Sequence, residues 1–346
     1  MRILLCAILS LGATTCGNHL PAARASQSAA VAKPCSAWTA PRAPEHPADS
    51  IRAVFMALDD RLDTSISQQR AFFDTFRMNA VVVHSIVGYR SLHSSRTANR
   101  VRQAAYLLHN RPPGTAVYIG LAYAEKFNSD ELSPADVQLA IDQDLAAAAE
   151  LRRVAGTDTS RIAGWYLSRE IHNFNLVPPA RQTEQVKRIR AYLEGVAGAL
   201  HPRGKVLISP YFVPKVRPRE SELLGPAATG ALFAQLVRRT GVTDVLLQDG
   251  VGVRNSPDHQ LECRWPDAAD YIPIAARYAE AVSRSLPDSV TFWSNLEGFV
   301  QDSDRPVDVQ RRFAQQLSVV PAGRPLVMYD AAQCKAVGVC ATRPRP

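Results

Sequence analysis

The feature that most constrains the fold of this chain is a repeated alternation of short apolar segments with longer amphipathic ones. Seven windows have apolar residues recurring every three or four positions, as in helices that cover a sheet, at 64–77, 96–109, 134–154, 180–200, 226–239, 267–285 and 307–319. Between and around them lie near-continuous apolar runs typical of buried strands, at 51–59, 80–87, 116–123, 162–170, 205–212, 244–250, 290–297 and 325–330. Eight strand–helix units predict an α/β protein whose eight parallel strands close into a (β/α)8 TIM barrel.

An open, doubly wound sheet is the alternative arrangement of such units. That fold normally has a glycine-rich, phosphate-binding turn after its first strand, and residues 58–61 here read Leu-Asp-Asp-Arg. The sequence therefore favours the closed barrel. No helical pattern follows the eighth strand, so we expect the last helix to be missing or replaced by terminal segments.

The N-terminus has the pattern of an export signal. Residues 1–13 carry one positive charge followed by an apolar run too short to span a bilayer. Cleavage after Ala25 would define a signal peptide of residues 1–25, whereas lipidation of Cys16 would leave residues 1–15 as the signal. Both alternatives predict an exported protein, periplasmic, extracellular or lipid-anchored to the envelope. An Ala/Pro/Ser-rich linker then covers 26–48, the barrel 49–333 and a C-terminal tail 334–346.

Composition limits the partners. The formal net charge is +8, but the basic residues are interleaved with acidic or apolar ones in helical windows such as 181–190. This pattern indicates solvated helix faces and not a nucleic-acid footprint; an acidic polysaccharide is a weaker possibility. We expect a monomer that takes a carbohydrate substrate and no cofactor or metal, with membrane contact only through a lipid on Cys16.

The cysteines beyond the signal are even in number, which indicates disulfides in an oxidising compartment. Cys334 and Cys340 could close a small loop in the tail, and Cys35 could then pair with Cys263. Free buried thiols are the alternative. A metal site is disfavoured because no Cys-x-x-Cys or His-x-x-x-His spacing accompanies these residues.

Two glutamates carry the functional prediction. Glu170 ends the fourth predicted strand and Glu297 the seventh, and in a parallel barrel the active site lies at the C-terminal ends of the strands. Two-residue alternation would turn both side chains to the same side of their strands as the residues two and four positions earlier. Glycoside hydrolases use two opposed carboxyl groups to cleave the glycosidic bond. The reaction retains the anomeric configuration when the two groups are about 5–5.5 Å apart and inverts it when they are about 6.5–9.5 Å apart.

The same rule collects further residues as substrate ligands. Polar and aromatic side chains at strand ends suit a sugar, because rings stack on pyranose faces while amides and carboxylates bind hydroxyls. The candidates are Asp59, His84, Tyr123, His172, Asn173, Tyr211, Gln248, Asp249, Trp293, Asn295 and Tyr329. The two histidines could equally be hydrogen-bonded structural residues, and Asp249 could simply belong to a glycine turn. Arg169, by alternation, should point away from Glu170 toward a flanking helix.

Four ordered segments resemble the bacterial family called domain of unknown function 4434, a family grouped with glycosidase-type TIM barrels. They are 164–170 (Gly-Trp-Tyr-Leu-Ser-Arg-Glu), 208–212 (Ile-Ser-Pro-Tyr-Phe), 248–252 (Gln-Asp-Gly-Val-Gly) and 293–297 (Trp-Ser-Asn-Leu-Glu). The placement of the acids is also similar to that in the large retaining glycosidase superfamily. That similarity implies that Glu170 is the acid/base and Glu297 the nucleophile. The superfamily usually has Asn before its strand-four Glu, whereas this chain has Arg169.

Two other functions remain compatible with the sequence. One is a non-catalytic glycan-binding barrel in polysaccharide export or metabolism, which needs the aromatic residues but not two opposed acids. The other is a metal-dependent hydrolase, for which Asp59, Asp60 and His84 would supply an early-barrel cluster.

Overall fold

The computed structural model describes most of the predicted barrel. The described residues are 51–58, 62–88, 94–123, 132–174, 179–214, 224–251, 268–297, 306–329, 331, 334 and 340. The predicted signal and linker, Asp59, Cys35 and Cys263 lie outside them.

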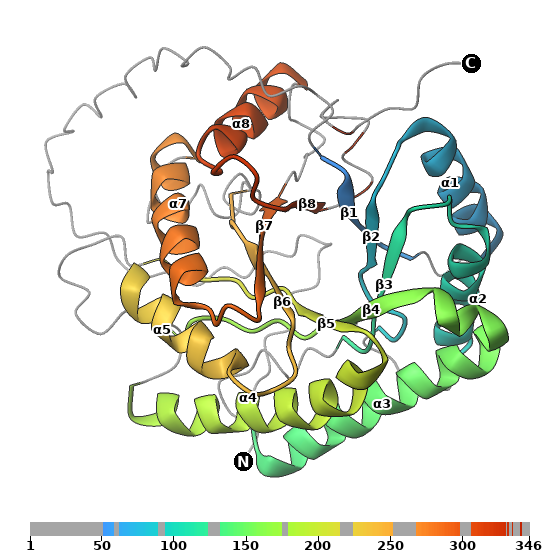
Figure 1. The fold of residues 1–346 in the computed structure, drawn as a ribbon, viewed down its shortest axis with the longest axis horizontal. Coiled ribbons are helices and arrows are strands. Elements are labelled where there is room, and N and C mark those ends of the chain that lie inside the picture. The colour runs from blue at the N-terminus through green and yellow to red at the C-terminus, as the bar shows by residue number, and fades with distance from the viewer. Residues whose placement is uncertain are drawn as a thin grey trace, which may run out of the picture. The chain divides into compact units, whose positions relative to one another are not determined.

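Eight parallel strands form a closed barrel in the order of the chain, as predicted (Figure 1). Each strand pairs with its neighbours in sequence, and β1 pairs with β8 to close the ring. The strands are β1 (Ala53–Met56), β2 (Ala80–Val83), β3 (Ala116–Gly120), β4 (Ile162–Leu167), β5 (Lys205–Ile208), β6 (Asp244–Gln248), β7 (Thr291–Glu297) and β8 (Leu326–Tyr329).

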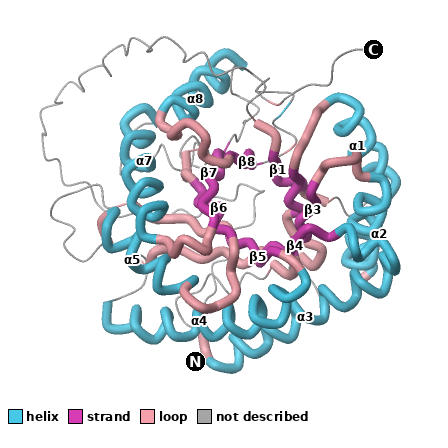
Figure 2. Tube along the Cα trace, in the orientation of Figure 1, coloured by secondary structure: helices cyan, strands magenta, loops and turns pink. Residues whose placement is uncertain are grey.

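Helices surround the strands on the outside of the barrel (Figure 2). Within the described ranges they are α1 (Leu62–Thr75), α2 (Ser95–Asn110), α3 (Pro134–Ala155), α4 (Pro179–Leu200), α5 (Pro226–Val237), α7 (Ala268–Ser285) and α8 (Pro306–Ser318), with short 3₁₀ turns η3 (Gly156–Arg161) and η4 (His201–Arg203). None of these described helices is long and apolar enough to cross a membrane.

The strands bury both faces, which explains their nearly continuous apolar sequences. Side chains such as Phe55, Tyr166 and Leu246 form a cluster inside the barrel. The alternate residues pack outward into the larger cluster between strands and helices. Trp165 is one of these, and Arg152 of α3 lies over its ring with the guanidinium carbon 4.9 Å from the ring centroid. The predicted outward orientation of Trp165 is therefore confirmed.

Local sequence sets the start of the helices that flank the site. Ser133 caps α3: its hydroxyl accepts a hydrogen bond from the Asp136 amide, and the Asp136 carboxylate accepts one from the Ser133 amide, with Pro134 in the first turn. Ser94 caps α2 by accepting from the Thr97 amide at 3.2 Å. These caps fix the residues at which α2 and α3 begin.

Gly120, the last residue of β3, permits a close approach of β2. A Cβ atom at this position would lie 2.1 Å from the carbonyl oxygen of His84 and 2.3 Å from that of Val83. Because both obstacles are backbone atoms, no side-chain movement could relieve the clash. The glycine therefore brings the ends of β2 and β3 together at the C-terminal face of the barrel.

The end of the chain supports the seam between β1 and β8. The Ala331 amide donates a 2.6 Å hydrogen bond to the Phe55 carbonyl, and Ile51 forms a parallel bridge with Cys340. The Cα atoms of Cys334 and Cys340 lie 5.2 Å apart, a distance compatible with the predicted disulfide between them. Because few residues after β8 are described, the predicted lack of a final helix stays a prediction.

Candidate active site

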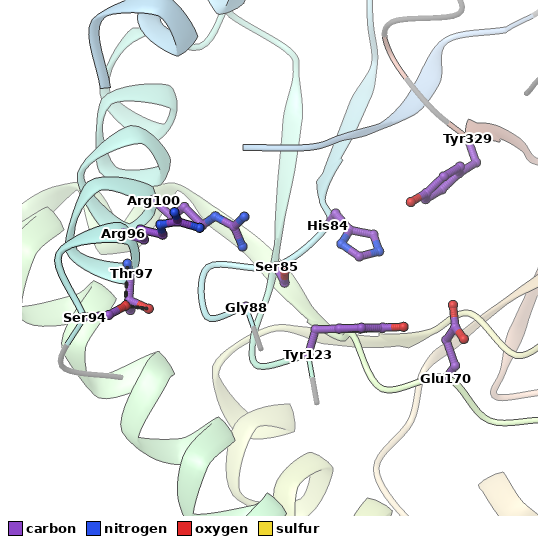
Figure 3. A pocket seen from close by; sticks show the side chains of 10 residues that line it. All are labelled: His84, Ser85, Gly88, Ser94, Arg96, Thr97, Arg100, Tyr123, Glu170 and Tyr329. Carbon is purple, nitrogen blue, oxygen red and sulfur yellow. Dashed lines mark hydrogen bonds between the residues drawn. The ribbon is translucent and has the colours of Figure 1, made fainter. Parts of the chain in front are cut away.

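A cavity of about 350 Å³ opens at the C-terminal ends of the strands (Figure 3). Its walls come from the residues after β2, β3 and β4, from the last residue of β8, and from the first turns of α2. The described lining residues are His84, Ser85, Gly88, Ser94, Arg96, Thr97, Arg100, Tyr123, Glu170 and Tyr329. Its volume lies at the lower end of the range for small-molecule sites, about 300–1,000 Å³.

Glu170 is the carboxylate of this cavity. The sequence predicted Glu170 as the last residue of the fourth strand. Strand β4 ends at Leu167, so Glu170 lies three residues beyond the strand. Its side chain nevertheless extends into the space shared by the hydroxyls of Tyr123 and Tyr329 (Figure 3). Tyr166 belongs to the cluster inside the barrel, and its pKa is raised well above its usual value, first by burial and next by the charge of Glu170.

His84 occupies the middle of the cavity. Its ring centroid lies 5.7 Å from that of Tyr123, 6.5 Å from Tyr166 and 5.8 Å from Tyr329. Burial, followed by the positive charge of Arg100, lowers the pKa of His84 to about 4. The imidazole is therefore neutral near pH 7 and offers one donor and one acceptor. The Ser168 hydroxyl donates a 2.6 Å hydrogen bond to the His84 carbonyl, which joins the segments that follow β4 and β2, the two strands that pair with β3.

Glu297 has a different environment. It is the last residue of β7, only 3% exposed, and among the described residues it does not line the cavity. Its register partner on β8 is Tyr329, which does line the cavity. Paired residues of adjacent parallel strands project to the same face. The register therefore turns Glu297 toward the barrel interior next to the cavity wall, while residues 298–305 after it lie outside the described ranges.

Asp249 holds the end of β7. Its Oδ1 accepts hydrogen bonds from the amides of Val251 and Glu297, each at 3.1 Å, and its Oδ2 accepts one from Gln316 Nε2 at 2.6 Å. Gln316, on α8, also donates to the Glu297 carbonyl at 3.2 Å. Burial raises the pKa of Asp249 to about 6, against the opposing effect of these donors and of Arg312. Asp249 thus positions the backbone of Glu297, a role the sequence analysis did not assign.

A buried ion pair holds the ends of β3 and β4. Asp144 of α3 is fully buried and accepts hydrogen bonds from Arg169 Nε at 3.1 Å, from the Tyr192 hydroxyl at 2.7 Å and from the Ala122 amide at 2.8 Å. Arg169 also donates to Gln143 Oε1 at 3.0 Å. Arg169 precedes Glu170, and Ala122 precedes Tyr123, so one carboxylate positions two residues of the cavity. The predicted contact of Arg169 with a flanking helix is confirmed.

Asp144 was missed by the sequence analysis although a signal existed. The buried face of α3 is otherwise apolar around it, with Ala140, Ala147, Ala148 and Leu151. An acid on such a face requires a buried partner, because an unpaired charge is very costly in an apolar interior. The sequence indicates that Asp144 needs a buried cation as its partner, but it does not show that Arg169 is that cation.

The structure gives His172 and Asn173 other partners than the cavity. The Phe174 amide donates to His172 Nδ1 at 2.9 Å, and the ring lies 5.4 Å from that of Tyr211. The fully buried Asn173 accepts from the Val213 amide at 3.2 Å and donates to the Val213 carbonyl at 3.1 Å. These contacts join the segments after β4 and β5. Among the described residues, none of these three predicted ligands lines the cavity.

The remaining predicted ligands lie inside the barrel below its rim. Gln248 donates to the Ser209 carbonyl at 2.7 Å, and Asn295 donates to the Ser209 hydroxyl at 3.0 Å. Trp293 donates through Nε1 to Asp244 Oδ1 at 2.9 Å. Trp293 lies four positions before Glu297 on β7, about 13 Å at 3.3 Å per residue, which places its ring well below the rim. Of the predicted substrate ligands, the structure brings His84, Tyr123 and Tyr329 to the cavity beside Glu170.

Comparison with solved structures finds other barrels at low similarity. A GH53 catalytic domain from Ignisphaera aggregans is 12% identical, with a TM-score of 0.48, over 88% of this chain and 92% of that one. A GH18 chitinase from Pseudoalteromonas aurantia is 10% identical, with a TM-score of 0.46, over 83% and 96%. A malate synthase from Haloferax volcanii is 10% identical, with a TM-score of 0.45, over 87% and 76%.

These likenesses are too distant to carry an argument about activity. No curated protein matches the chain. A family model does match, over residues 75–331, and its description is "Domain of unknown function (DUF4434)". The match covers well over half of the chain and includes β2 to β8, Glu170 and Glu297. The chain belongs to the DUF4434 family.

Proposed function

We propose that this protein is an exported glycoside hydrolase that cleaves a polysaccharide or oligosaccharide with retention of configuration. The observation that carries the proposal is the position of Glu170. It is a carboxylate in a cavity at the C-terminal ends of the strands, among aromatic side chains and a neutral histidine. The register of β7 and β8 supports Glu297 as the second acid, because it turns that side chain inward beside Tyr329.

In the proposed reaction, Glu170 acts first as a general acid. It donates its proton to the glycosidic oxygen as the bond to the anomeric carbon breaks, and the Glu297 carboxylate attacks that carbon from the opposite face. The products of this step are the free leaving-group sugar and a glycosyl ester on Glu297. Glu170, now a carboxylate, takes a proton from water, and the resulting hydroxide displaces Glu297 from the anomeric carbon.

The rest of the cavity binds and orients the sugar. The neutral imidazole of His84 and the hydroxyls of Tyr123 and Tyr329 match sugar hydroxyls in hydrogen bonding, and their rings offer apolar faces. The hydrogen bonds that the carboxylates of Asp144 and Asp249 accept hold the chain beside each acid, so that the acids need little reorganisation before reaction.

Substitution of each acid by its amide tests the proposal. We expect Glu170→Gln and Glu297→Gln to lower turnover by at least about a thousand-fold while binding of the oligosaccharide persists. Glu184→Gln, at an exposed position of α4, is the matched control and should retain full activity. Full activity in both acid variants on a substrate found by screening a polysaccharide panel would reject the assignment. The anomer first released, followed by NMR, separates retention from inversion.

A non-catalytic glycan-binding barrel is the second candidate. The observation in its favour is that Glu297 is buried and, among the described residues, not part of the cavity that contains Glu170. This candidate expects unmodified oligosaccharides after prolonged incubation with the wild-type protein. It also expects Glu297→Gln to bind glycans as the wild type does.

A further inference from the structure

We propose that the saccharide bound in this cavity carries an anionic substituent, a carboxylate or a sulfate, held by Arg96 and Arg100. This inference rests on the proposed function in one respect, that the ligand is a saccharide. It adds the chemical class of the substrate and two residues that determine specificity.

The first support is the distribution of charge around the cavity. Arg96 and Arg100 form the wall on the α2 side, and Glu170 lies at the other end, with His84 and Tyr123 between them (Figure 3). Among the described lining residues, Glu170 is the only carboxylate. A ligand that spans the cavity therefore meets a positive region at one end and the proposed general acid at the other.

The second support is the electrostatic effect of Arg100 inside the cavity. Its positive charge contributes to the lowered pKa of His84, so its field reaches the centre of the site. Because His84 stays neutral near pH 7, the centre can receive an uncharged sugar ring.

The third support is the way in which the chain builds the arginine wall. Ser94 caps α2 through the Thr97 amide, so the helix starts at a defined point and the two arginines, four residues apart, lie on one face. Like charges with this spacing repel each other, whereas an anion between them attracts both. Gly88 leaves room for the guanidinium, since a Cβ atom there would lie 2.7 Å from Arg100 Nη1.

An oxyanion suits this wall because the planar fork of arginine donates paired hydrogen bonds to carboxylate and sulfate oxygens. The helix amides are not the main ligand, because the Ser94 hydroxyl already accepts from the Thr97 amide. An acidic sugar offers these guanidinium groups an oxyanion acceptor that a neutral sugar does not offer, so the site should discriminate between acidic and neutral forms of the same polymer.

The test measures binding to the full-length Glu170→Gln protein, which should bind saccharides without cleaving them. The probes are short oligomers of galacturonic acid and of mannuronic acid, the same oligomers after reduction of their carboxyl groups, and a sulfated galactan oligosaccharide. In the Glu170→Gln background, Arg96→Gln and Arg100→Gln are compared with Arg102→Gln, which removes the same charge from an exposed position of α2.

We expect at least one anionic oligomer to bind about ten- to a hundred-fold more tightly than a neutral one, with an affinity that falls as salt rises. Arg96→Gln and Arg100→Gln should each remove most of that difference, and Arg102→Gln should not. Preference for the uronic acids identifies carboxylate as the anion, and preference for the galactan identifies sulfate. Arg100→Lys, which keeps the charge but not the fork, should lose part of the affinity even if Arg100→Gln fails to fold.

The proposal is overturned if acidic and reduced oligomers bind equally, if no anionic oligomer binds, or if Arg102→Gln weakens binding as much as Arg100→Gln does. Two results separate it from the proposed function. Cleavage of neutral oligosaccharides that is insensitive to Arg100→Gln would sink the inference and leave the hydrolase intact. Arginine-dependent binding of acidic oligomers that the wild type never cleaves would sink the hydrolase and leave the inference intact.

Discussion

Asp249 illustrates how a single residue in this barrel acquires a role from its surroundings. The residue lies in a Gln-Asp-Gly segment, where it could be a substrate ligand or part of a turn. In the folded chain its carboxylate accepts hydrogen bonds from two backbone amides and from Gln316. Burial raises its pKa to about 6 from an ordinary value of 3.8, so Asp249 takes up a proton more readily in the folded than in the unfolded protein.

This shift predicts a pH dependence of stability. Because the folded-state pKa is higher than the unfolded one, the stability that Asp249 contributes is fully present below about pH 3.8 and is lost as pH rises through about 6. The Asp249→Asn side chain does not take up a proton in this pH range. The difference in unfolding free energy, wild type minus variant, should therefore fall by more than about 1 kcal/mol between pH 4 and pH 6.5. Urea denaturation at several pH values measures it, and parallel curves would contradict the assigned environment.

Position at the end of a strand is not enough to predict that a residue binds the ligand. His84, Tyr123 and Tyr329 reach the cavity, whereas Asn173 and Gln248 occupy similar sequence positions but bind protein groups. The rule that active-site residues follow barrel strands selects residues that line the cavity and residues that bind other parts of the protein. It cannot distinguish the two groups, because the partner of Asn173 lies 40 residues away at Val213.

At the scale of elements, α3 determines how β3 and β4 end. The capping box at Ser133 starts the helix, and Asp144 on its buried face receives the Arg169 side chain and the Ala122 amide. The segments that carry Tyr123 and Glu170 therefore depend on one helix. Removing one partner of a buried ion pair is strongly destabilising, because the remaining charge is left buried without compensation.

We expect Asp144→Asn to lower the free energy of unfolding by about 3–5 kcal/mol. In a hydrolase assay it should reduce kcat more than it raises KM, because the displaced segments carry the proposed acid. Asp142→Asn, at an exposed position of the same helix, should change stability by less than about 0.5 kcal/mol. Thermal unfolding of both variants measures the difference, and equal effects would show that the ion pair does not hold these strand ends.

Element boundaries show where sequence periodicity stops being informative. The predicted helices agree with the observed ones to within two residues at each end, because caps and prolines mark their starts. The predicted strands continue beyond the observed ones by up to four residues at their C-terminal ends. The apolar pattern persists there, as in Ile208-Ser-Pro-Tyr-Phe212, although the chain has already left the sheet to form the rim of the barrel.

At the scale of the whole molecule, the closure of the barrel depends on the seam between β1 and β8. The register given for that pair is the single match of Val54 with Met328, whereas β1 and β2 pair over four residues. The Ala331 amide and the Ile51–Cys340 bridge extend the seam. The predicted Cys334–Cys340 disulfide would tether Cys340, which supplies the bridge to Ile51.

Removal of this disulfide should weaken the molecule as a whole. A bridge with a sequence separation of 6 closes a small loop, for which chain entropy predicts a contribution of about 2 kcal/mol. We therefore expect Cys334→Ser/Cys340→Ser to lower the free energy of unfolding by roughly that amount, with binding at the cavity unchanged. Chemical denaturation without reductant measures it, and an unchanged midpoint would mean that the seam does not need the bridge.

The sequence by itself determined the barrel, because near-continuous apolar strands alternating with amphipathic helices require a parallel sheet covered on both faces, and the glycine-rich turn of the open alternative does not follow the first strand. It also located Glu170 and Glu297 near the ends of strands. Only the tertiary structure decided which neighbours act with them. Arg169 and Asp144 are 25 residues apart, and Asp249 and Gln316 are 67. The local sequence pattern does not predict such contacts, because periodicity indicates the face of an element on which a side chain lies and not the distant residue that it contacts.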